Sequence, residues 1–256
     1  MRERERFVLT AICLSILLWV IQLVPISWRY LAIAVFTVLT YFVSALTLHK
    51  YLRLHHWLTF LPMPALFSLF VGCFYFLLPT NFWSMIAVLA TFAFGMYAFF
   101  LSGNIFCVAE HDKKIQLTRA AQNIILFFAI IISLLGCQVI FSFYWPFYID
   151  FLAIFALHLL LCLTVAWSVE LEPKISLELF QLCFFATLLI SEIALILSFL
   201  PLQPWHIALL IMSVFYLILG IIQIFIGDKL FRKNLREYFL LMIFIGIIYC
   251  LFFPGK

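Results

Sequence analysis

Two ionisable side chains, His158 and Glu192, fall inside stretches of sequence that are otherwise strongly apolar. At about 1.5 Å of rise per helical residue, His158 would lie roughly 16 Å and Glu192 roughly 12 Å below the outer membrane surface, on consecutive helices. An ionisable group at bilayer depth costs about 2.5–3.5 kcal/mol on insertion scales, so it usually has a partner or a function. The similar depths predict a His158–Glu192 pair, which would satisfy both groups or carry a proton.

The predicted helix that carries Glu192 has further polar residues on the same face. Glu178, Gln181 and Glu192 are separated by 3 and 11 residues. At 100° per residue, they lie within about 60° of one another. We expect this face to look into the helix bundle, since polar side chains inside a membrane avoid lipid. It would form either a polar pathway or, as we favour, an interhelical clamp without a transport role.

A second group of polar residues lies near a short basic loop between two predicted helices. Its members are Asn104, Glu110, Arg119, Gln122 and Asn123. Glu110 and Arg119 could pair across the loop, and Gly103 could cap or unwind the helix there. The cluster could form an enzyme site at the cytoplasmic face, although an ordinary helix–loop–helix cap accounts for the same residues. An enzyme site usually gathers more convergent acidic, His or Asn groups, so we assign no catalytic residue.

Motifs of known chemistry are missing from the sequence. H-E-x-x-H, the P-loop, G-x-S-x-G and G-x-G-x-x-G are all absent, and the histidines lack companions at a metal-ligand spacing. The seven cysteines fall in different predicted helices and form no C-x-x-C, so we expect them to pack as small apolar residues. We therefore predict no metal and no cofactor, and we favour a non-enzymatic protein.

The polar residues named above lie within or next to long apolar segments. The 256 residues are 68% hydrophobic and 10% charged, more apolar surface than a water-soluble domain of this size can bury. Nine spans of the length that a membrane needs are predicted, at about 7–27, 30–48, 57–79, 83–109, 120–143, 147–169, 176–200, 205–226 and 237–253. We expect one all-α integral membrane domain, residues 1–256, in the form of a polytopic transmembrane helix bundle. The last span is short, so the bundle has nine spans or eight.

The basic residues predict the orientation of the chain. With the N-terminus in the cytoplasm, 13 of the 15 Lys and Arg lie inside, and Arg29 and Lys256 lie outside. This bias follows the positive-inside rule, and most Trp fall at predicted helix ends, at headgroup depth. The basic segments all adjoin the membrane, so we expect anionic lipid headgroups, and other membrane proteins, as partners rather than nucleic acid.

Two turns on the predicted outer side resemble each other. Leu78–Trp83 reads LPTNFW and Leu200–Trp205 reads LPLQPW, and each joins an outward helix to an inward one. Spans one to four and five to eight could then be parallel repeats, an arrangement known from some transporters. Pro and Trp are also common at membrane interfaces, which accounts for the likeness without duplication.

Several motifs carry a family resemblance over most of the chain after about residue 75. They are Leu101–Ala109, Arg119–Ala121, Trp167–Glu172, Lys229–Arg232 and Arg236–Tyr238. These stretches resemble an uncharacterised family of bacterial multi-pass membrane proteins from candidate-phyla lineages. The resemblance implies location in a bacterial inner membrane and brings no known activity.

Three functions remain open for such a chain. We favour a non-enzymatic membrane protein with a structural, assembly or lipid-interacting role, because polar residues are few and the loops are short. The first alternative is a small transporter of an amphipathic or lipid-linked solute that uses the His158/Glu192 pair. The second is a membrane-embedded enzyme with its site near Asn104 and Glu110.

Overall fold

The computed structural model describes residues 3–49, 56–78, 81–109, 117–172, 175–226 and 240. Within these ranges the regular structure is entirely helical. The chain forms two compact units: unit 1 comprises residues 1–132 and unit 2 comprises residues 133–256. Helix α6 (Thr118–Ser142) contributes its first part to unit 1 and its second part to unit 2.

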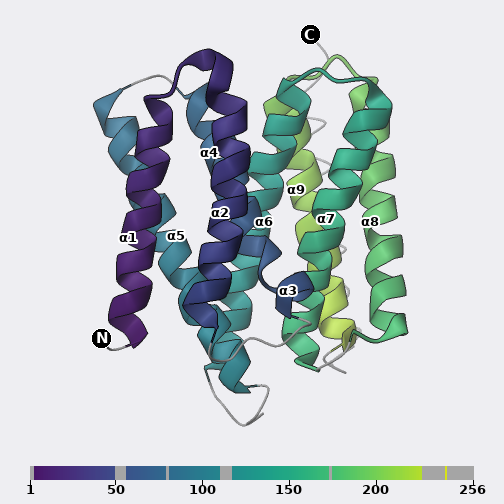
Figure 1. The fold of residues 1–256 in the computed structure, drawn as a ribbon. Coiled ribbons are helices and arrows are strands. Elements are labelled where there is room, and N and C mark those ends of the chain that lie inside the picture. The colour runs from purple at the N-terminus through teal and green to yellow at the C-terminus, as the bar shows by residue number, and fades with distance from the viewer. Residues whose placement is uncertain are drawn as a thin grey trace. The chain divides into compact units, whose positions relative to one another are not determined.

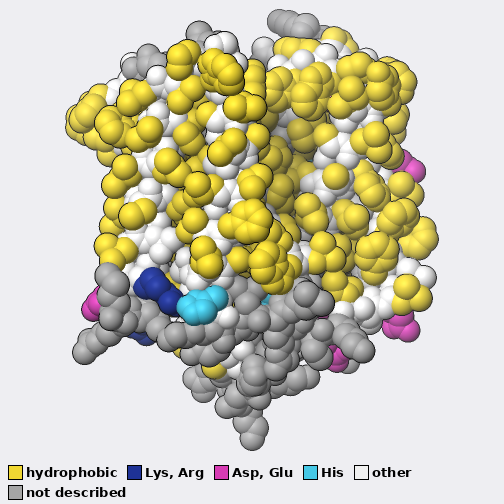
Figure 2. Space-filling view, in the orientation of Figure 1, with side chains coloured by type: hydrophobic (Ala, Val, Ile, Leu, Met, Phe, Trp, Pro, Cys, Tyr) yellow, Lys and Arg dark blue, Asp and Glu magenta, His cyan; other side chains and the backbone are white. Residues whose placement is uncertain are grey.

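Eight helical segments of the described chain are long and apolar enough to cross a membrane. They match the first eight predicted spans, and this part of the prediction is confirmed. Many large hydrophobic side chains of these helices are exposed. Figure 2 shows hydrophobic side chains over most of the visible described surface. The ninth predicted span, 237–253, lies outside the described residues apart from Leu240.

Unit 1 contains α1 (Glu3–Gln22), α2 (Arg29–Leu48), α4 (Pro62–Leu77), α5 (Phe82–Ala109) and the first part of α6 (Figure 1). Helix α1 packs against α5 and α2, and α2 packs against α4. A single 3₁₀ turn, η1 (Ile26–Trp28), leads into α2. The predicted first span therefore ends earlier than expected, at Gln22, and its last residues form the turn.

The third predicted span is divided where its prolines begin. A short helix, α3 (His56–Thr59), is followed by α4, which starts at Pro62. The third span therefore contains a short break, and Pro62 begins its longer part. Proline is tolerated at the first helical position because its missing N–H has no intrahelical acceptor there.

An aromatic cluster fills the middle of unit 1. The ring of Phe67 stacks on Phe92 at 5.6 Å between centroids and meets Phe99 and Phe128 edge-on at 5.5 and 5.4 Å. Gly95 of α5 lies directly beneath this ring, since a Cβ there would be 2.7 Å from two Phe67 carbons. The absence of a side chain at Gly95 thus lets α4 and α5 approach.

Gly103, further along α5, also allows neighbouring side chains to pack closely against the helix. The sequence suggests that it caps or unwinds the helix, but α5 continues to Ala109. A Cβ at Gly103 would lie 2.7 Å from the ring of Phe60 and 3.0 Å from Leu48. Gly103 therefore serves close packing rather than a helix end.

Unit 2 contains α7 (Phe147–Glu170), α8 (Leu177–Ser198), α9 (Pro204–Ile226) and the second part of α6 (Figure 1). Helix α7 packs along α8, and α9 contacts both. The end of α7 is fixed by Leu171 in the left-handed conformation, and by the Trp167 indole, which donates to the Glu172 carbonyl at 3.0 Å. Ser176 then caps α8 by accepting a hydrogen bond from the backbone N–H of Leu179 at 3.1 Å.

Three pairs of corresponding helices, leaving out α1 and α6, pack in the same way inside each unit. The two similar turns equate α2 with α7, α4 with α8 and α5 with α9. In unit 1, α2 packs on α4 and α5 contacts both; in unit 2, α7 packs on α8 and α9 contacts both. This packing is what parallel repeats would produce, although duplication itself stays a prediction.

Candidate functional site

His158 lies fully buried in α7 with both ring nitrogens engaged. Its Nδ1 is 2.9 Å from the carbonyl oxygen of Ile154, and its Nε2 is 2.9 Å from the hydroxyl of Ser133 on α6. Because a carbonyl oxygen can only accept, Nδ1 carries a proton, and in a neutral ring Nε2 accepts from the Ser133 hydroxyl. Phe215 of α9 meets the ring edge-on at 4.8 Å. His158 therefore connects α7 with the second part of α6 through a side-chain hydrogen bond.

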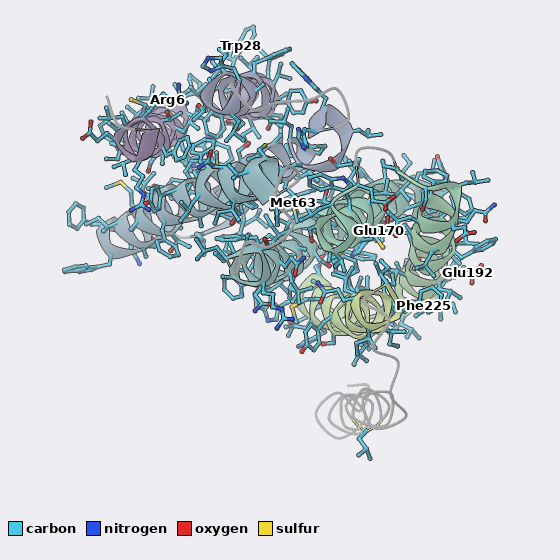
Figure 3. All side chains as sticks on the ribbon, turned by 90° about the horizontal axis from the view of Figure 1, so that it is seen from below. Arg6, Trp28, Met63, Glu170, Glu192 and Phe225 are labelled. Atoms are coloured by element: carbon cyan, nitrogen blue, oxygen red, sulfur yellow. The ribbon has the colours of Figure 1, made fainter. Side chains whose placement is uncertain are left out.

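Glu192 lies on the exposed surface of α8, whereas His158 is buried. Its side chain is exposed, and Figure 3 shows it at the outer margin of α8, directed away from α7 and α9. The predicted His158–Glu192 pair is not formed, since His158 already has two partners inside the unit. The whole polar face is turned outwards, because Glu178 and Gln181 are also exposed. Contrary to expectation, this face of α8 does not look into the bundle.

Glu178 takes part in a different feature from Glu192. It lies in the first turn of α8, about 21 Å along the helix from Glu192. There it lines a cavity of about 370 Å³ together with Glu170 and Ser176. The four residues of the predicted intramembrane site, His158, Glu192, Gln181 and Glu178, therefore do not converge on one place.

Four of the five residues of the predicted cytoplasmic cluster lie within the described residues. Glu110 lies outside the described residues, so its pairing with Arg119 stays a prediction. Arg119 and Asn123 are exposed near the start of α6, and Gln122 is half-buried. The Oδ1 atom of Asn104 is buried and has no hydrogen-bond partner among the described residues. A catalytic role for this cluster therefore stays a prediction.

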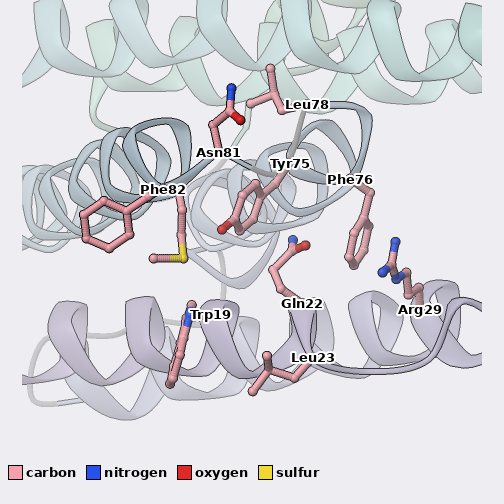
Figure 4. A pocket seen from close by; sticks show the side chains of 10 residues that line it. Trp19, Gln22, Leu23, Arg29, Tyr75, Phe76, Leu78, Asn81 and Phe82 are labelled. Atoms are coloured by element: carbon pink, nitrogen blue, oxygen red, sulfur yellow. The ribbon is translucent and has the colours of Figure 1, made fainter.

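A cavity of about 380 Å³ opens at the end of unit 1 opposite to the N-terminus (Figure 4). We call it the Arg29 cavity. The end of α1, the start of α2, the end of α4 and the start of α5 converge there. Its lining includes Trp19, Gln22, Arg29, Tyr75, Phe76 and Asn81. Aromatic walls thus surround a small number of polar groups, as in many ligand sites.

The polar groups of the Arg29 cavity are hydrogen-bond donors held in place by the fold. The guanidinium carbon of Arg29 lies 4.8 Å from the ring centroid of Phe76, and Nε donates to the Val24 carbonyl at 3.3 Å. The Nε2 atom of Gln22 is buried without a hydrogen-bond partner among the described residues. Figure 4 shows the Gln22 amide and the Tyr75 ring directed into the space between their helices. An unpaired buried donor costs free energy, so a ligand acceptor would be stabilised here.

No family model, curated protein or solved structure matches this chain. The resemblance to bacterial multi-pass membrane proteins therefore stays an expectation from short motifs.

A second cavity, of about 390 Å³, opens in unit 2 where the α6–α7 and α8–α9 turns lie. We call it the Asp150 cavity, after a carboxyl group that is 5% exposed. Sequence reasoning missed its residues and those of the Arg29 cavity. The sequence analysis placed Arg29 on the outer side of the membrane but gave it no role, and it gave no role to Gln22 or Asp150. Arg29 and Asp150 lie within a turn of a predicted span's end, and Gln22 lies five residues before one, so these positions were the available signal.

Proposed function

We propose that this chain is a non-enzymatic, lipid-interacting membrane protein that binds an anionic lipid headgroup in the Arg29 cavity. The observation that carries the proposal is the convergence of Arg29 and the unpaired Gln22 amide on an aromatic-walled cavity at the helix ends. Helix ends of a membrane-spanning bundle lie at headgroup depth, where Trp and Tyr are favoured.

The charge of the Arg29 cavity selects the ligand class. Its described lining contains a guanidinium group and two amide side chains, Gln22 and Asn81, and no carboxylate. A guanidinium group recognises phosphate through two parallel charge-assisted hydrogen bonds. The Phe76 ring lies 4.8 Å from the guanidinium carbon of Arg29, so the charged group is held against the aromatic wall of the cavity. A phosphodiester headgroup, with its acyl chains against the apolar helices, fits this combination.

The alternatives have less support from the structure. The transporter hypothesis depended on His158 and Glu192 acting together, and the described contacts separate them. The enzyme hypothesis depended on Asn104 with Glu110, and Glu110 lies outside the described residues. We retain as proposals the cytoplasmic N-terminus, the bacterial inner membrane and the attraction of the basic loops to anionic headgroups.

Lipid retention on the full chain tests the proposal. The protein is placed in nanodiscs of equal parts phosphatidylglycerol and phosphatidylcholine, released, and the bound lipids are counted by native mass spectrometry. We expect Arg29→Gln to reduce the preference for phosphatidylglycerol roughly tenfold, the size of one charge-assisted hydrogen bond. Arg119→Gln is the matched control, since Arg119 is an exposed arginine outside the cavity.

Two outcomes would overturn the assignment. One is an unchanged lipid preference in Arg29→Gln. The other is an equal loss in Arg119→Gln, because general surface charge would then account for retention. Free glycerol phosphate added to the nanodiscs should compete weakly if the acyl chains contribute to binding, as the apolar lining indicates.

A further inference from the structure

We propose that the Asp150 cavity of unit 2 binds the ammonium group of an amphipathic molecule. This inference is independent of the proposed function, because it concerns other residues and a ligand group of the opposite charge. It starts from the position of Asp150 in the first turn of α7, at the end of unit 2 that carries the α6–α7 and α8–α9 turns.

Asp150 is a buried acceptor without a donor. Its side chain is 5% exposed, and Oδ1 has no hydrogen-bond partner among the described residues. The hydroxyl of Ser198, which also lines the cavity, donates to the carbonyl of Leu195 at 2.7 Å. Leaving a carboxyl oxygen buried and unpaired is costly, so such a group marks a place where a ligand donor belongs.

The described part of unit 2 supplies no Lys or Arg side chain that could pair with Asp150. Residues 133–172, 175–226 and 240 contain no Lys or Arg. The start of α7 favours negative charge at Asp150, because the helix dipole places partial positive charge there. A buried carboxyl group with no Lys or Arg in this described part leaves its oxygen for an organic cation from outside.

Aromatic rings around the carboxyl group specify what kind of cation fits. Phe147 and Phe199 line the cavity with their ring centroids 5.5 Å apart, and Trp145 lines it while stacked on Phe143 at 4.8 Å. Ring faces attract ammonium groups by the cation–π interaction. The volume of about 390 Å³ is that of a small-molecule site. A metal ion would need further oxygen ligands, whereas one carboxylate and several rings suit an ammonium group.

The ammonium group could be part of a lipid headgroup or of a free amine, and the experiment separates these sources. Full-length protein is prepared in nanodiscs of phosphatidylglycerol that contain a small fraction of phosphatidylethanolamine. The control nanodiscs contain N-acetyl phosphatidylethanolamine, in which the ammonium group has become an amide. Native mass spectrometry counts the retained lipid. In a second arm, isothermal titration calorimetry measures dodecylamine and ethanolamine binding in pure phosphatidylglycerol nanodiscs.

We expect at least a tenfold preference for the ammonium form over its acetylated form in wild-type protein. Asp150→Asn, which keeps the shape of the side chain, should abolish that preference. Glu192→Gln, which removes an exposed carboxylate of the same unit, should leave it unchanged. Retained phosphatidylethanolamine identifies a lipid source, and saturable dodecylamine binding identifies a free amphipathic amine; either result supports the ammonium site. Dodecylamine should bind more tightly than ethanolamine, because its alkyl chain adds apolar contact.

The proposal is overturned if wild-type protein fails to distinguish ammonium from acetylated ligands in both arms. It is also overturned if Asp150→Asn folds and keeps the preference, since another group would then bind the cation. The comparison of ligands on wild-type protein needs no variant, so it remains decisive even where Asp150→Asn does not fold. Failure of the Arg29 experiment leaves this result unaffected, because Arg29 belongs to unit 1.

Discussion

Replacing Gly95 by alanine should destabilise unit 1, because the space for a methyl group is already occupied. The new Cβ would lie 2.7 Å from Cε1 and Cζ of Phe67 and 3.0 Å from Cε1 of Phe128. Carbon atoms in contact are normally about 3.5–4.0 Å apart, so the Phe67 ring must retreat by about 1 Å. It has little room, because it stacks on Phe92 at 5.6 Å and meets Phe99 and Phe128 at its edges.

The magnitude follows from two opposing effects. Overpacking a filled core costs about 1–3 kcal/mol, whereas Gly→Ala inside a helix gains about 0.5–1 kcal/mol from reduced backbone freedom. Gly72→Ala is the matched control, since the nearest atoms to its Cβ, in Ile33 and Leu18, lie at 3.7 Å. Both variants gain the same free energy from the reduced backbone freedom of alanine in a helix. We therefore expect Gly95→Ala to be less stable than Gly72→Ala by about 1–3 kcal/mol.

The free energy of unfolding is measured by titrating SDS into mixed micelles and following helicity by circular dichroism. Phe67→Leu should relieve the clash, so the double variant with Gly95→Ala should recover about 1 kcal/mol relative to the sum of the single changes. Equal stability of Gly95→Ala and Gly72→Ala would refute the close approach of α4 and α5.

Two further predictions use the same unfolding measurement. Ser133→Ala should lower the free energy of unfolding by about 1 kcal/mol, because it leaves Nε2 of His158 without its donor, whereas Ser213→Ala should change it by less, since Ser213 bonds to its own helix. Equal effects in the two serine variants would remove the clamp role of His158. Glu192→Gln should maintain or raise stability, by up to about 2 kcal/mol, because it removes an outward-facing carboxylate at membrane depth. A loss of more than about 1 kcal/mol in Glu192→Gln would instead reveal a specific partner for the carboxylate.

The membrane-spanning segments could be predicted from the sequence because water-soluble folds rarely contain apolar runs that are long enough to cross a bilayer. Local chemistry refined the boundaries. Pro62 starts a helix, and Ser176 caps one, for reasons that involve neighbouring residues alone. The turn after Gln22 was not predicted, although Pro25 in this segment is a local signal that ends a helix.

Depth along a helix was predictable, but rotation about its axis was not. His158 and Glu192 do lie inside their apolar helices, but one points into unit 2 and the other points out of it. In a water-soluble bundle the apolar face identifies the inside of each helix. Lipid tails are as apolar as a protein core, so this signal is lost in a membrane. The polar face of α8 was assigned inwards on the argument that polar groups avoid lipid, and the structure turns it outwards.

The two cavities depend on convergence of helix ends that are distant in sequence, which no local pattern encodes. They nonetheless share one sequence feature, because each is lined by residues from one of the two similar turns: Leu78 and Asn81 in unit 1, and Leu200 and Pro204 in unit 2. Helices α2 and α7 are counterparts in the parallel-repeat correspondence, and each contributes a charged residue from its first turn, Arg29 or Asp150. If the halves arose by duplication, the two cavities have acquired opposite charge on a common framework. Opposite charge is what distinguishes a phosphate site from an ammonium site, so each half would recognise a different group at a membrane surface.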